Sequence, residues 1–167
     1  MNAALLLAAA LAAAPDAGPP PDAAAQAAFA ALERPHAEFL RAKLEAPPGQ
    51  PPDVDAATLK LKRLQSRYEQ VVQLGAPRWS VASWVRIGEL IWHLAEMLDA
   101  VPVPLEVKKL GPDEERTYLN ALRQRQNTIR DQAVEFWKRA AALATRFKVQ
   151  SPELEAVRAR WKAYVER

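Results

Sequence analysis

The chain has 167 residues, of which 50% are hydrophobic and 26% charged, with 14 prolines, 5 glycines and no cysteine. This length and apolar content allow one domain with a self-supporting core and exclude a fully disordered chain, while the lack of cysteine excludes disulfides, thiolate metal sites and a cysteine nucleophile. The net charge of +3 comes from bases interspersed with acids, which is more typical of a solvated helical surface than of a nucleic-acid-binding face.

Residues 1–22 have the composition of a secretory signal peptide followed by a linker. Residues 1–14 read MNAALLLAAALAAA, an apolar run shorter than the roughly 20 residues that span a bilayer. The run resembles the apolar region of a signal peptide, with small residues at a cleavage site. No base precedes it and Pro15 follows it directly, so an uncleaved alanine-rich tail is the alternative. We expect export to the periplasm or cell envelope, with the cytoplasm as the other location.

Residues 23–52 are rich in alanine and proline, and we expect a tether that contains short helices. Apolar residues recur at helical spacing from residue 23 to residue 46, but Pro35 divides the run, which predicts two short helices or one kinked helix. Residues 47–52 read PPGQPP and predict a stiff, extended spacer. His36 falls within the tether.

Residues 53–167 form the predicted helical domain. Their apolar residues recur at intervals of three and four, without alternation of period two, which predicts an all-α fold. Turn signals place the first two helices at residues 55–74 and 79–98. A third helix of about 35 residues begins near residue 112, and a fourth begins at Ser151-Pro152.

Two of these helices contain the sequence pattern of a tetratricopeptide repeat. Residues 84–91 read WVRIGELI, the order of the first helix of that repeat, and residues 133–140 read AVEFWKRA, the order of the second. The glycine lets a neighbouring helix approach closely, and the large side chains fill the space around that contact. The repeat anchors are Trp84, Ile87, Gly88, Ile91, Ala133, Trp137 and Ala140.

On these segments the chain resembles the tetratricopeptide proteins of myxobacterial and related cell envelopes. The resemblance covers roughly residues 60–167 and implies antiparallel helix pairs stacked as a short α-solenoid. Corresponding helix positions recur about 70 residues apart, twice the usual repeat of about 34. Residues 99–127 are then either a helical insertion within one repeat or a degenerate repeat. We favour the insertion, because residues 112–130 continue one helix without a turn signal.

The resemblance also implies a partner-binding face. In this family the first helix of a repeat lines the concave surface, and the positions that match here are Ala82, Val85, Glu89, Trp92 and His93. We expect Val85, Glu89, Trp92 and His93 to contact the partner, because tryptophan is over-represented among binding hot spots. Packing of Trp92 in the core is the alternative.

The same helix also carries a candidate metal-binding or catalytic face. Glu89, His93 and Glu96 share one face and could hold a divalent ion or support acid–base chemistry. No second helix supplies an obvious set of ligands, and the chain contains no GxSxG, HExxH or glycine-rich phosphate loop. We therefore expect no metal, no cofactor and no enzymatic activity.

The predicted function is a non-enzymatic adaptor or scaffold that binds another protein or an extended peptide, with no transmembrane span. The terminal helix carries an apolar edge, Leu154, Val157, Trp161 and Val165, which favours self-association or docking onto a larger envelope assembly. The alternative is a basic helical domain that binds an anionic polymer or membrane surface, because lysine and arginine are densest between residues 138 and 162. Nucleic-acid binding is not expected, since acids interrupt this stretch.

Overall fold

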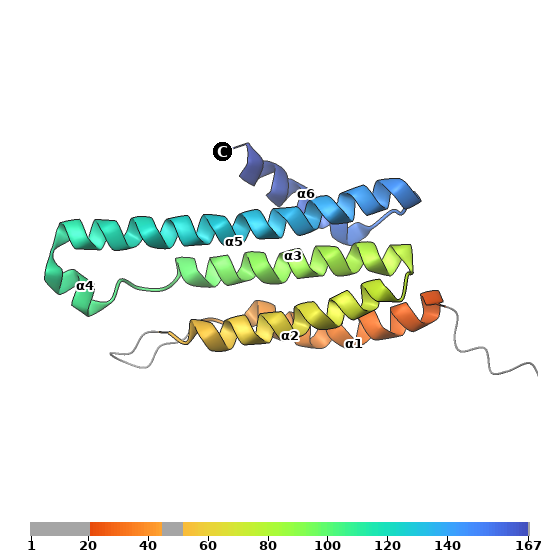
Figure 1. The fold of residues 1–167 in the computed structure, drawn as a ribbon, viewed down its shortest axis with the longest axis horizontal. Coiled ribbons are helices and arrows are strands. Elements are labelled where there is room, and N and C mark those ends of the chain that lie inside the picture. The colour runs from red at the N-terminus through yellow and green to blue at the C-terminus, as the bar shows by residue number, and fades with distance from the viewer. Residues whose placement is uncertain (1–20, 45–51, 167) are drawn as a thin grey trace, which may run out of the picture.

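The computed structural model describes residues 21–44 and 52–166, which form helices joined by short loops (Figure 1). The helices are α1 (Pro21–Arg41), α2 (Val54–Gln73), α3 (Pro77–Asp99), α4 (Leu105–Leu110), α5 (Pro112–Phe147) and α6 (Pro152–Val165). Within these ranges there is no strand, and the all-α prediction is confirmed. The predicted signal peptide lies almost entirely outside the described residues.

Local sequence signals place the ends of the helices. Gly75 (φ +76°) and Gly111 (φ +125°) take up backbone conformations that other residues rarely adopt, directly before α3 and α5. A proline then starts each helix, where its missing N–H costs nothing. The Ser151 hydroxyl accepts a hydrogen bond from the Leu154 amide at 3.2 Å and caps α6. Because these signals are local, the four helices predicted for residues 53–167 begin and end within about two residues of the expected positions.

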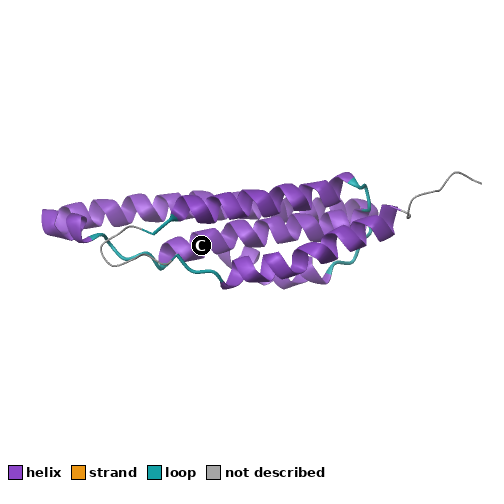
Figure 2. Cartoon of the chain, turned by 90° about the horizontal axis from the view of Figure 1, so that it is seen from below, coloured by secondary structure: helices purple, strands orange, loops and turns teal. Residues whose placement is uncertain are grey.

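Helix α3 lies at the centre of the molecule. It packs along α5 on one side and along α1 and α2 on the other, and its contact with α5 is the most extensive between any two helices (Figure 1). More than half of its 23 residues are buried. Seen from below, the helices run nearly lengthwise and give an elongated bundle (Figure 2). The central position of α3 explains why its sequence is apolar on most sides.

Helix α1 belongs to this bundle, which corrects the prediction of a tether over residues 23–52. It is a single helix that continues through Pro35. Its buried residues follow helical spacing and join the core around α2 and α3; they are Ala25, Phe29, Leu32, His36 and Phe39. Burial of three large apolar side chains offsets the cost of proline inside a helix, about 3 kcal/mol. The helical domain therefore begins at α1, while residues 45–51 of the predicted spacer lie outside the described ranges.

Helix α4 and the first turns of α5 project beyond the end of α3 (Figure 1). Helix α4 was not predicted, because prolines flank it and it has only six residues. Helix α5 runs without a break through 36 residues, and its first buried residue is Gln126. Residues 112–125 thus contribute no buried side chain.

Candidate functional site

The contact between α3 and α5 is centred on Gly88 and Trp137. The Trp137 ring is fully buried, and its Nε1–H donates to the Val85 carbonyl oxygen at 3.2 Å. A β-carbon on Gly88 would lie 2.3 Å from that Nε1 and 3.0 Å from the Ala133 carbonyl oxygen. Only glycine fits at position 88 without displacing the ring. Of the other residues in the two repeat-like segments, Ile87, Ile91, Ala133 and Ala140 are buried, and half-buried Trp84 packs against Phe136.

The partner-binding face expected on α3 lies inside the protein. Val85 is fully buried, and the Trp92 ring stacks on Trp137 with 5.4 Å between ring centroids. Tyr164 of α6 covers the Trp92 ring edge-on at 5.3 Å. Val85 and Trp92 therefore form core, and their assignment as partner contacts is corrected. The cause is tertiary, since α5 and α6 close over this side of α3.

The two polar members of that predicted face turn towards α1. His93 Nε2 lies 3.1 Å from the Ala42 carbonyl oxygen, just beyond the end of α1. Glu89 Oε2 lies 2.8 Å from Arg86 Nη1 and 3.5 Å from His36 Nε2. The face that sequence reasoning left open is thus occupied by the helix that it had read as a tether. In the described residues no group of three or more acidic or histidine side chains could hold a metal ion.

Charged side chains join α1 to α3 at this buried interface. The Arg86 guanidinium donates two hydrogen bonds to the Glu33 carboxylate, at 3.1 and 2.8 Å, in addition to its bond to Glu89. Burial by itself would raise the pKa of Glu89, but His36 and Arg86 outweigh it and hold this pKa below its ordinary value. Burial and the nearby Glu33 charge raise the pKa of Tyr68. The Arg86 side chain is only 22% exposed, so these ion pairs belong to the packed interface between α1 and α3.

The polar side chains that lack a hydrogen bond gather at the same interface. In the described part of the chain they are His36 Nδ1, the Tyr68 hydroxyl, the Trp79 Nε1 and the Ser83 hydroxyl. All four residues are on α1, α2 or the first half of α3. Each buried polar atom without a hydrogen bond lowers stability. Because these atoms lie around α1, we expect the α1 contact to be less stable than the α3–α5 contact. Sequence reasoning missed His36, although its helical spacing from Phe29 and Leu32 was a usable signal.

Replacing Glu89 with glutamine should give a pH-dependent loss of stability. The lowered pKa means that the Glu89 carboxylate stabilises the fold above its unfolded pKa of about 4.3, and that this contribution disappears as pH falls through the lower folded pKa. We expect the free energy of unfolding of Glu89→Gln to be about 2 kcal/mol below that of the wild type at pH 7. The difference should shrink below pH 4. Urea denaturation between pH 7 and pH 2.5 measures it.

The matched control for that experiment is Glu38→Gln, which removes a carboxylate from an exposed pair with Arg34. Its effect should stay within a few tenths of a kcal/mol at every pH, since exposed pairs contribute little. A Glu89→Gln deficit that is the same at pH 7 and pH 3 would contradict the prediction.

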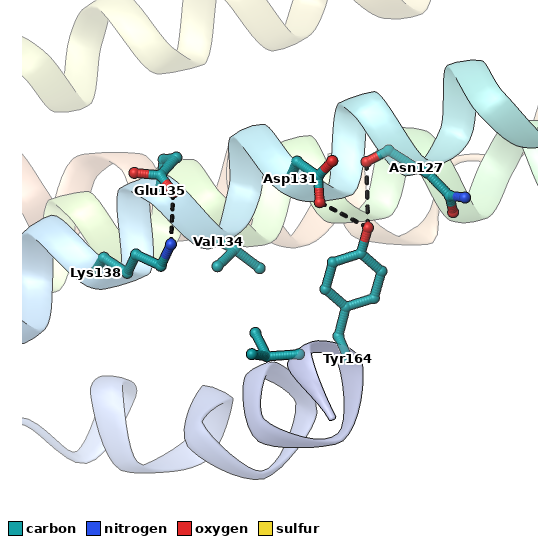
Figure 3. A pocket seen from close by; sticks show the side chains of 7 residues that line it. Asn127, Asp131, Val134, Glu135, Lys138 and Tyr164 are labelled. Atoms are coloured by element: carbon teal, nitrogen blue, oxygen red, sulfur yellow. Dashed lines mark hydrogen bonds and ion pairs between the residues drawn. The ribbon is translucent and has the colours of Figure 1, made fainter. Parts of the chain in front are cut away.

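A groove opens between α5 and α6, where the two helices diverge (Figure 3). Its volume is about 520 Å³, and it is lined by Asn127, Asp131, Val134, Glu135, Lys138, Tyr164 and Val165. The Tyr164 hydroxyl reaches from α6 and donates to Asp131 Oδ1 at 2.8 Å, which bridges the groove at one end (Figure 3). A second hollow of about 420 Å³ shares Val165 and is lined by Ala141, Arg158, Trp161, Lys162 and Glu166. We call the two hollows together the α5–α6 groove.

Only part of the apolar edge predicted for α6 is exposed to solvent. Leu154 and Val157 are buried against the bundle, and Trp161 is half-buried. Val165 remains 62% exposed and lines both hollows of the α5–α6 groove. The first two residues of the predicted edge thus hold α6 in place, and the last two face the groove.

The projecting end of the molecule carries three exposed large apolar side chains, including the most exposed one of the described ranges, Leu110. Leu110 is 70% exposed and Leu105 62% exposed, and Leu119 of α5 is also exposed. We call these three residues the α4–α5 end. Residues 105–119 also contain four acids and three bases. This end is therefore a candidate protein-docking surface.

The basic residues between 138 and 162 are mostly engaged with neighbours. Lys138, Arg158 and Lys162 pair with Glu135, Glu155 and Glu166. The guanidinium groups of Arg139, Arg146 and Arg160 lie over the rings of Phe136, Phe147 and Trp92. Bases that are interleaved with acids and rings do not concentrate positive potential on one face. This arrangement weakens the alternative of an anionic ligand.

Comparisons with known proteins found no relative of this chain. No family model matches the chain, and neither the curated proteins nor the solved structures contain a significant match. Among the described helices, none is long and apolar enough to cross a membrane.

Proposed function

We propose that this chain is a non-enzymatic adaptor that binds another protein through the α4–α5 end, in the bacterial cell envelope. The observation that carries the proposal is the exposure of Leu105, Leu110 and Leu119 at an end that the bundle itself does not cover. The four acids and three bases of residues 105–119 nearly cancel, so this end has no excess of positive charge that would attract an anionic membrane or polymer. A protein surface with an apolar hollow and mixed charges fits this end.

The tetratricopeptide resemblance is part of the proposal. The close approach at Gly88, against Ala133 and Trp137, is the contact that the repeat pattern implies between its two helices. The α3–α5 pair then corresponds to one repeat, with α4 and the first turns of α5 as its insertion. The apolar run near the N-terminus supports export. A rigid helical scaffold that presents the α4–α5 end loses little ordering entropy on binding.

Photo-crosslinking from position 110 tests the proposed docking surface. With a photoreactive phenylalanine analogue at position 110 of the full chain, cells of the source organism should give one discrete adduct heavier than the 18.5 kDa chain. The double variant Leu105→Ser/Leu119→Ser should reduce the adduct about tenfold, since losing apolar hot-spot contacts costs at least about 1.4 kcal/mol. Raising the salt concentration should change the yield little.

The matched control is the same analogue at position 59. Leu59 of α2 is 51% exposed but stands apart from the α4–α5 end. It should give no adduct of the same mass. Equal adducts from positions 59 and 110, or an adduct that high salt abolishes, would overturn the proposal.

A further inference from the structure

The α5 and α6 sides of the α5–α6 groove contribute opposite charge, α5 to the first hollow and α6 to the second. On the α5 side, the first hollow is lined by two acids and one base: Asp131, Glu135 and Lys138. On the α6 side, the second hollow is lined by two bases and one acid: Arg158, Lys162 and Glu166. Val134, Trp161 and Val165 supply apolar surface between them. A ligand that matches this groove needs an apolar centre with one basic and one acidic side.

The α5–α6 groove itself has an apolar centre with one acidic and one basic side, so a second copy of the groove meets this requirement. A two-fold axis along the groove would place the acidic α5 side of one copy opposite the basic α6 side of the other. The same axis brings Val165 of both copies together at the centre. We propose that the α5–α6 groove docks a second copy of this chain, side by side, in a symmetric dimer.

The level of the charged residues along the groove indicates which pair would meet. Helix α6 runs back along α5, and Tyr164 contacts Asp131 (Figure 3). Because the two helices run in opposite directions, residues before Tyr164 on α6 correspond to residues after Asp131 on α5, and on this basis the proposed dimer pairs Lys162 with Glu135. Because an axis along the groove preserves the position along it, Glu135 of one copy faces Lys162 of the other. Their present partners within the chain, Lys138 and Glu166, hold them through exposed pairs that contribute little.

The interface is small and its apolar centre is limited to a few side chains, so the dimer is expected to be transient and concentration-dependent. This proposal is independent of the α4–α5 end, which lies away from the groove at the projecting end of α5 (Figure 1). The two surfaces can therefore be tested separately on the same protein.

Sedimentation equilibrium of the full chain over a hundredfold range of concentration tests the dimer. The weight-average mass of the wild type should rise from 18.5 kDa towards twice that value. Val165→Asp should remain monomeric, because it places two like charges on the axis. The control Leu59→Asp, at an exposed leucine of α2, should dimerise like the wild type. Circular dichroism verifies that each variant keeps its helix content.

A charge exchange tests the pairing itself. Glu135→Lys and Lys162→Glu should each weaken dimerisation at least tenfold, and the variant with both substitutions should recover most of it. A wild type that stays monomeric throughout would leave the groove to a different polypeptide and overturn the proposal. Dimerisation that is insensitive to Val165→Asp, or a double variant no better than the single ones, would overturn it as well.

Discussion

Replacing Trp137 with alanine should lower the free energy of unfolding by about 3–5 kcal/mol. The ring is fully buried at the most extensive contact of the bundle, stacked on Trp92 and bonded to the Val85 carbonyl oxygen. Its removal leaves a cavity that α3 and α5 cannot close without giving up the packing of their neighbours. Chemical denaturation with tryptophan fluorescence and circular dichroism as two probes measures the change.

Trp84→Ala is the matched control, because Trp84 contacts the same pair of helices from a half-buried position. Its cost should be about 1–2 kcal/mol. Equal costs for the two tryptophans would contradict a central role for Trp137.

The interaction between Gly88 and Trp137 can be isolated with a double-mutant cycle. Gly88→Ala alone should cost about 1–3 kcal/mol, since its β-carbon would lie 2.3 Å from Trp137 Nε1. In the Trp137→Ala background the same change should be neutral or stabilising, because alanine is the better helix former by about 1 kcal/mol. Additive effects in this cycle would show that the close approach at position 88 is not what requires glycine.

Replacing Arg86 with alanine should destabilise the protein by about 2–3 kcal/mol and release α1. Arg86 holds the carboxylates of Glu33 on α1 and Glu89 on α3, so its loss leaves two partly buried negative charges without a cation. Breaking a fully buried pair costs about 3–5 kcal/mol, and the partial exposure of Arg86 and Glu33 lowers that figure. Urea denaturation measures the loss, and hydrogen exchange should show faster exchange of α1 amides than of α5 amides.

Arg34→Ala serves as the control for that experiment. Arg34 lies on the same stretch of α1 and pairs with Glu38 at 2.9 Å, but it is almost fully exposed. Its replacement should cost no more than about 0.5 kcal/mol. If Arg34→Ala and Arg86→Ala had the same effect, the interface network would contribute nothing beyond a surface ion pair.

The existence and limits of α2, α3, α5 and α6 could be predicted because the information is local. Glycine and proline at the starts of α3 and α5, and Ser151 before α6, act on the backbone within one turn. The six-residue α4 was not predictable by the same rules, since it is too short for a periodic pattern. Helix α1 was misread because Pro35 is a reliable local breaker, and only the burial of Phe29, Leu32 and Phe39 against other helices outweighs it.

The candidate sites could be predicted only where the residue type implies the contact. A glycine beside a tryptophan in the repeat pattern indicates a close helix approach, and the structure has Gly88 against Trp137. The partner-binding face on α3 was wrong for Val85 and Trp92, because no property of α3 reveals how many helices will cover it. The α4–α5 end and the α5–α6 groove were not visible in the sequence, since each depends on where α3 stops or on how far α6 diverges.

The sequence by itself determined that this chain is all-helical, where most of its helices start and stop, and that a neighbouring helix comes close at position 88. These properties follow from backbone preferences and residue volumes, which act at short range. Only the tertiary structure decided that α1 closes over α3, that Trp92 packs in the core, and that α5 and α6 contribute opposite charges to the α5–α6 groove. Those outcomes depend on which apolar helix faces pack together. Hydrophobic burial is non-directional, so the sequence of one apolar face does not specify which other face covers it.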